Sequence, residues 1–173
     1  MAEALLAHRL RAAGVAATVR SAGTRAVGGP ASGHAVDVLA GVGLDLSRHE
    51  SRPLDRQAVA SADLVLAMAR EHLREAVVLD RRSLPKSFTL KELVRRGGAV
   101  GPRRPGEALA DWLQRAAAGR STAALMGSDP IDDVTDPIGR PRADYERTHA
   151  ELAELVDRLV ALAWPPGAGP DPG

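Results

Sequence analysis

The sequence predicts an α/β fold in which helices flank a parallel, doubly wound sheet. Two observations carry this prediction: helical and strand-like segments alternate along the chain, and residues 63–68 form one continuous apolar run. Alternating order produces βαβ crossovers, and a strand that is apolar throughout is typical of a parallel sheet buried on both faces. The composition agrees, because the hydrophobic residues, 45% of the chain, are mostly Ala, Leu and Val, whereas aromatic residues make up 2%.

The first elements are a helix, a strand and a second helix. Apolar residues recur at helical spacing over residues 3–13, and Gly14 can supply a left-handed cap. Residues 15–21 then predict a short strand that ends at Ser21. Ser32 is a candidate N-cap for a helix that ends near Ala40.

The middle of the chain repeats this alternation. The apolar strand at residues 63–68 is followed directly by a helix that begins at Arg70. Residues 88–93 predict a short strand and a helical turn. The glycines and prolines of residues 97–106 predict an exposed loop, and residues 107–118 predict a further helix.

The last predicted element is the longest helix, at residues 142–163, where apolar side chains recur at helical intervals. Residues 164–173 are rich in proline and glycine, so we expect a disordered tail. The sequence therefore predicts one α/β domain over residues 1–163.

Composition and charge exclude several classes of function. The net charge of +1 and the scarcity of aromatic residues argue against a nucleic-acid partner. No apolar run approaches the ~20 residues that cross a bilayer, so we expect no membrane partner and a cytoplasmic location. No histidines have ligand spacing, and the acidic stretch around Asp132 lacks the glycine and glutamate of a calcium loop, so we expect neither a metal nor a cofactor.

Three separated motifs point to one family. They are Ser-Ala-Gly-Thr at residues 21–24, His-Glu-Ser-Arg-Pro-Leu at residues 49–54, and Asp-Asp-Val-Thr-Asp-Pro-Ile-Gly at residues 132–139. With these motifs in this order, and with the apolar strand at residues 63–68, the sequence resembles the low-molecular-weight protein tyrosine phosphatases. The resemblance spans about residues 1–163.

The resemblance implies a two-step phosphoryl transfer through a phosphocysteine intermediate. Asp136 would be the general acid that protonates the leaving group, and Pro137 restricts its backbone to extended conformations. Ser21 and His49 match residues that brace the family's phosphate-binding loop. Ile138 departs from the family pattern, in which an aromatic residue that lines the groove for the substrate's phenyl ring often follows Asp-Pro.

The nucleophile that the resemblance requires is absent, because the chain contains no cysteine. In the family, a central strand and a loop with the cysteine and an arginine precede the segment that begins here at Met1. We therefore expect an N-terminally truncated chain, through a start site assigned too late or a real truncation, whose sheet lacks its first, central strand.

The function expected from the resemblance is hydrolysis of phosphotyrosine esters in proteins, or of small aryl phosphates, with the chain as given inactive. One alternative is a catalytically inactive pseudophosphatase that acts as a binding or regulatory module. Another is an arsenate-reductase-like relative, which would also need cysteines.

Overall fold

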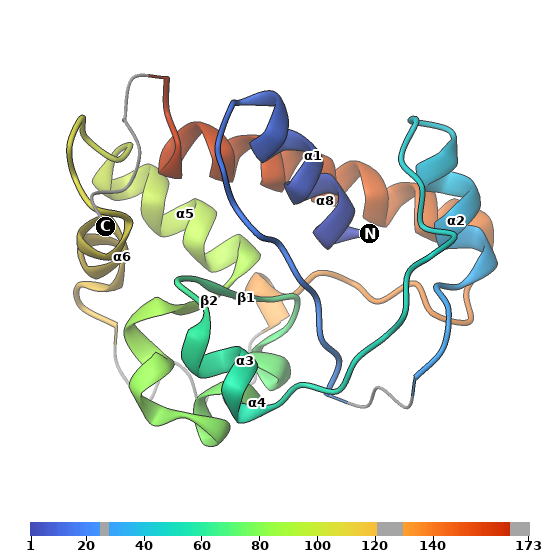
Figure 1. The fold of residues 1–173 in the computed structure, drawn as a ribbon, viewed down its shortest axis with the longest axis horizontal. Coiled ribbons are helices and arrows are strands. Elements are labelled where there is room, and N and C mark those ends of the chain that lie inside the picture. The colour runs from blue at the N-terminus through green and yellow to red at the C-terminus, as the bar shows by residue number, and fades with distance from the viewer. Residues whose placement is uncertain (25–27, 121–129, 167–173) are drawn as a thin grey trace. The chain divides into compact units, whose positions relative to one another are not determined.

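The computed structural model describes residues 1–24, 28–120 and 130–166 (Figure 1). The chain forms two compact units. The first comprises Met1–Leu54 and Val134–Asp157, and the second comprises Asp55–Asp133 and Arg158–Gly173. Of the predicted tail, residues 167–173 lie outside the described part of the chain.

The described residues of the first unit form the helices α1 (Ala2–Ala12) and α2 (Gly33–Ala40) and the larger part of α8 (Arg142–Ala163). Their apolar faces form its core, in which the most buried side chains include Leu5, Leu10, Leu39, Tyr145, Leu152 and Val156. The Arg9 guanidinium of α1 bonds both carboxylate oxygens of Asp157 in α8, at 2.5 and 3.2 Å. Gly14 has φ +73°, as expected for a glycine that ends a helix.

The strand predicted at residues 15–21 is wrong. These residues have no assigned strand, and most of their side chains are exposed. The nearest pairing is an isolated parallel bridge between Gly23 and Pro53, supported by the hydrogen bond from the Gly23 N–H to the Arg52 carbonyl at 2.8 Å. An extended segment becomes a strand only when a neighbour satisfies its backbone groups, and the described part of the chain provides no such pairing for residues 15–21.

The second unit contains a two-stranded parallel sheet of β1 (Val65–Ala67) and β2 (Ser87–Thr89), with Leu66 opposite Phe88. The connection between the strands runs through α4 (Arg70–Leu79) and the 3-10 helix η1 (Arg81–Lys86). This βαβ order confirms the α/β prediction. The short helix α3 (Arg56–Ser61) precedes β1.

Burial of the two strands differs from the sequence prediction. All three residues of β2 are buried, whereas in β1 only Ala67 is buried, and Val65 and Leu66 are half-buried. The apolar run at residues 63–68 therefore has the composition of a central strand but only one paired neighbour among the described residues.

Helix α5 (Leu90–Val100) begins where β2 ends, and the Thr89 hydroxyl caps it by accepting the Glu92 N–H at 3.1 Å. The predicted loop at residues 97–106 is wrong in its first part, because Gly97 and Gly98 lie inside α5. Gly97 is buried, and a Cβ atom built on it would lie 2.8 Å from the Trp112 ring of α6 (Leu109–Ala117). Close helix packing, rather than a turn, explains this glycine.

Candidate functional site

Asp136 lies in an irregular segment of the first unit, between two buried residues, Val134 and Pro137. Its side chain is exposed, and Oδ1 accepts the backbone N–H of Ile138 at 3.0 Å. The chain then turns at Gly139, which has φ +72°. Two inward-facing neighbours therefore hold the segment, while the carboxylate of Asp136 faces solvent.

Ser21 and His49 meet on one carboxylate, that of Glu3 in the first turn of α1. The Ser21 hydroxyl donates to Glu3 Oε2 at 2.5 Å, and His49 Nδ1 lies 3.6 Å from the same oxygen. The structure thus brings together the two residues that the resemblance assigned as braces. The sequence reasoning missed Glu3, although a carboxylate in the first turn of a helix is favourably placed near the positive end of the helix dipole.

Asp136 is not joined to this group. Within residues 1–24, 28–120 and 130–166, no hydrogen bond or ion pair links Asp136 to Glu3, Ser21 or His49. The first unit therefore presents two separate sets of candidate residues, an exposed acid and a braced carboxylate.

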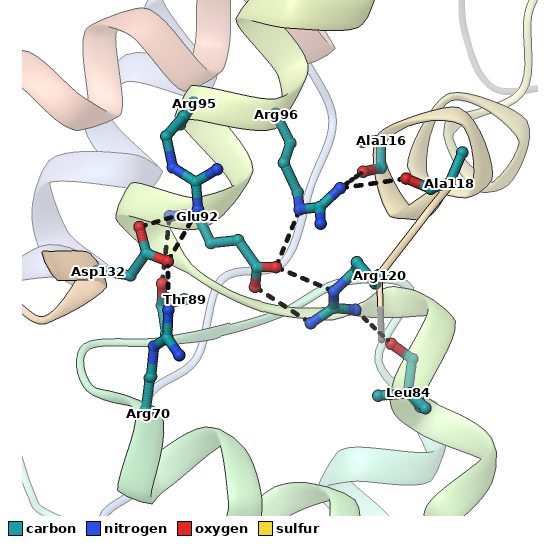
Figure 2. Close-up of polar contacts among 10 residues, drawn as sticks. All are labelled: Arg70, Leu84, Thr89, Glu92, Arg95, Arg96, Ala116, Ala118, Arg120 and Asp132. Carbon is teal, nitrogen blue, oxygen red and sulfur yellow. Dashed lines mark hydrogen bonds and ion pairs between the residues drawn. The ribbon is translucent and has the colours of Figure 1, made fainter. Parts of the chain in front are cut away.

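Two aspartates, Asp132 and Asp133, precede residues 134–140, which we call the acid segment after the candidate acid Asp136. Both belong to the second unit and are engaged in ion pairs or capping, and Figure 2 shows the contacts of Asp132. Asp132 is buried, and its carboxylate accepts from Arg70 at 3.0 Å and from Arg95 at 2.9 Å. Asp133 Oδ1 accepts the first N–H of α4, that of Arg70, at 2.8 Å, and its carbonyl accepts from Lys91 Nζ at 2.7 Å. A carboxylate at a helix N-terminus also interacts favourably with the helix dipole.

A second buried carboxylate, that of Glu92 in α5, holds two further arginines (Figure 2). Arg120 bonds both of its oxygens, at 3.0 and 3.1 Å, and Arg96 bonds one of them at 3.1 Å. Arg120 also donates to the Leu84 carbonyl at 3.0 Å, and its guanidinium carbon lies 4.3 Å from the centre of the Phe88 ring. This arrangement is a packed ion-pair cluster that joins α5, η1 and β2 within one unit.

Two classes of site find no support in the part of the chain that the structure describes. No group of three or more histidines, aspartates or glutamates is placed to hold a metal ion. No described helix is both long and apolar enough to cross a membrane.

Comparisons with known proteins decide the family. The family model for low-molecular-weight phosphotyrosine protein phosphatases matches residues 1–100. The chain belongs to this family. The resemblance seen in the separated motifs is therefore confirmed, and protein phosphatases are the class of hydrolase to which the chain is related.

Individual members of the low-molecular-weight phosphatase family match most of the chain. A protein-arginine-phosphatase from Bacillus subtilis is 34% identical over 161 residues, which is 92% of this chain and 85% of that protein. The crystal structure of a low-molecular-weight protein tyrosine phosphatase from T. tengcongensis matches with a TM-score of 0.67 and 32% identity over 92% of this chain and 86% of that one. The YwlE arginine phosphatase from Geobacillus stearothermophilus matches with a TM-score of 0.63 and 30% identity, over 91% of this chain and 79% of that one.

Proposed function

We propose that this chain carries the acid segment and the supporting groups of a protein phosphatase whose substrate is phosphoarginine in proteins. The observation that carries the proposal is Ile138, which stands exposed beside Asp136 in a chain 34% identical to a protein-arginine-phosphatase. A guanidino group offers no aromatic ring to stack on. An aliphatic side chain at this position therefore fits a substrate with a guanidino group better than a substrate with a phenyl ring.

The aromatic residues of the chain support the same substrate class. Phe88, Trp112 and Tyr145 are buried, and Trp164 is half-buried. The described chain therefore has no fully exposed aromatic side chain to line a groove for a phosphotyrosine ring. Phosphotyrosine is the second candidate substrate, because a family member that is 32% identical is a tyrosine phosphatase.

In the proposed reaction, Asp136 acts on the leaving group. A thiolate attacks phosphorus, the P–N bond of phosphoarginine breaks, and the Asp136 carboxyl gives its proton to the departing guanidino nitrogen. The resulting carboxylate then accepts a proton from the water that hydrolyses the phosphocysteine. Glu3, Ser21 and His49 are supporting groups that do not exchange protons with the substrate.

Residues 1–173 cannot supply the thiolate, since they contain no cysteine. We propose that the chain by itself is inactive. Incubated with a phosphoarginine protein or with an aryl phosphate, it should release no phosphate above the buffer rate. Turnover by the unmodified chain would contradict the thiolate mechanism for this protein.

The acid role is tested in a chain extended at its N-terminus with the strand and cysteine loop of the Bacillus subtilis relative. We expect hydrolysis of phosphoarginine in this extended chain, and Asp136→Asn should lower kcat by roughly a hundredfold or more. Asp37→Asn changes another exposed aspartate of the same unit and should leave kcat unchanged. An equal effect of both substitutions would remove Asp136 from the acid role.

Paired substrates test the specificity. Two peptides of one sequence, phosphorylated on arginine or on tyrosine, are given to the extended chain, and faster hydrolysis of phosphotyrosine would overturn the phosphoarginine assignment.

A second candidate function is a pseudophosphatase that binds phosphorylated proteins, which the absence of cysteine favours. It would be supported if the extended chain were inactive on both peptides while the unmodified chain bound one of them in a calorimetric titration.

A further inference from the structure

Helix α8 carries a polar residue at a buried position of its apolar stripe. Tyr145, Leu152 and Leu155 are buried at helical spacing along this helix, and Thr148, between them, is only 6% exposed. A valine would fill the same volume. A buried hydroxyl is unfavourable unless it is hydrogen-bonded, so the identity of this residue requires an explanation.

The partner of this hydroxyl is in the acid segment. Thr148 Oγ1 donates to the carbonyl of Thr135 at 3.3 Å. Threonines within helices commonly donate to a carbonyl one turn earlier in the same helix, whereas this contact reaches 13 residues back along the chain. The distance is longer than the usual ~2.5–3.0 Å for a hydroxyl donor, so a small displacement of either partner breaks it.

Thr135 directly precedes Asp136, so its carbonyl belongs to the peptide plane that leads into Asp136. On the other side, Pro137 is buried and restricts Asp136 to extended backbone conformations. The Asp136 carboxylate is further tied to the Ile138 N–H. Once the Thr135 carbonyl is held, few rotations remain that move the carboxylate.

We propose that Thr148 is a positioning residue for Asp136, which it orients through the Thr135 carbonyl. The inference rests on the proposed function for its catalytic meaning, because it deepens the role assigned to Asp136. Both residues and the helix segment between Arg142 and Asp157 lie in the first unit, so the contact is a property of that unit alone.

A positioning role and a packing role predict different effects of Thr148→Val. Thr135 is exposed, so water can replace the lost donor at its carbonyl, and the valine keeps the volume inside the helix stripe. The overall stability should therefore change little. The effect should be confined to residues 135–140, where the acid segment loses its attachment to α8.

The test uses the full unmodified chain and its Thr148→Val, Thr148→Ser and Leu152→Val variants. Solvent exchange of backbone amides is measured by NMR, with the Ile138 amide as the reporter of the Asp136 hydrogen bond. We expect about tenfold faster exchange of the Ile138 amide in Thr148→Val, the factor that loss of one hydrogen bond produces, and exchange as in the wild type in Thr148→Ser. Leu152→Val removes packing from the same stripe. It should speed the exchange of α8 amides without a preferential effect on the Ile138 amide.

Ile138 exchange that is unchanged in Thr148→Val, or raised equally throughout α8, would overturn the proposal. Failure of Thr148→Ser to restore the wild-type rate would also overturn it, because serine keeps the donor. These outcomes do not depend on activity. If Asp136→Asn left turnover of the extended chain intact, the acid role would fail, while the exchange result would still decide whether Thr148 holds the segment.

Discussion

Removal of the Arg120 guanidinium should destabilise the second unit strongly. In Arg120→Met, Glu92 loses two of its three arginine contacts and the Leu84 carbonyl loses a donor. The contact of the guanidinium with the Phe88 ring is lost as well. Methionine fills much of the volume of the arginine stem, so the change removes charge and hydrogen bonds more than packing.

The size of the expected loss of stability follows from the burial of the Arg120–Glu92 pair. The side chains of Arg120 and Glu92 are only 8% and 12% exposed, and burial lowers the pKa of the Arg120 guanidinium while Glu92 opposes this effect. Removing one partner of a buried ion pair lowers the free energy of unfolding by about 3–5 kcal/mol. Because Arg96 still pairs with Glu92 in the variant, we expect the lower end of this range. We therefore expect a loss of about 3 kcal/mol, a large part of the ~5–15 kcal/mol that stabilises a typical domain.

Urea unfolding followed by tryptophan fluorescence measures this loss, because Trp112 is fully buried in the same unit. The matched control is Arg142→Met. It breaks an Arg–Glu contact of 2.8 Å with Glu146 in which both side chains are more than half exposed, and it should leave the unfolding midpoint unchanged. A loss below about 1 kcal/mol for Arg120→Met, or equal effects of the two substitutions, would refute the argument from burial.

Two further predictions concern α5 and the segment that follows it. Gly97→Ala should lower the free energy of unfolding by about 1–2 kcal/mol, because its Cβ would lie 2.8 Å from the Trp112 ring. Gly98→Ala has nothing within 4 Å of the new Cβ and should raise the free energy of unfolding by about 0.5–1 kcal/mol in the same urea assay. A stabilising effect of Gly97→Ala would disprove the close packing. The hydrogen bonds from Arg115 lower the pKa of Glu107 from 4.5 to about 2, so the ionised pair stabilises fully above pH 4.5 and its contribution is lost as the pH falls through about 2. Glu107→Gln should therefore be less stable than the wild type at pH 6, the two should converge near pH 2, and a difference independent of pH would contradict the ion-pair origin.

Local patterns predicted the helices well. The helix predicted at residues 142–163 is found as Arg142–Ala163, and the predicted start at Arg70 is the first residue of α4. Helices are readable from sequence because their hydrogen bonds join residues four apart, so the information is local. The segment at residues 15–21 has strand-like composition, yet a strand depends on a distant partner that composition does not reveal.

The loop predicted at residues 97–106 was wrong at its two glycines for a different reason. Gly97 and Gly98 together are typical of a loop, and nothing nearby in the sequence shows that a tryptophan ring occupies the space beside Gly97. The short helix α3 was missed because six residues are too few to display a helical period.

The candidate site was predicted in part. The resemblance pointed to Ser21 and His49, and the structure shows what the resemblance left out, namely that both reach Glu3. Glu3 and Thr148 were missed because each is defined by a contact across the fold, over 18 and 13 residues of sequence. The assignment of Asp136 as the acid stays a prediction until its substitution is tested.

The division of the chain has a consequence for its biosynthesis. The first unit is discontinuous, since Met1–Leu54 must combine with Val134–Asp157, and Arg9 finds its carboxylate partner only at Asp157. At ~5–20 residues per second, a ribosome needs about 4–16 s to make the roughly 80 residues in between. During that interval the Arg9 guanidinium has no Asp157 to bind, so the first unit cannot complete this ion pair until the whole second stretch of its chain has been made.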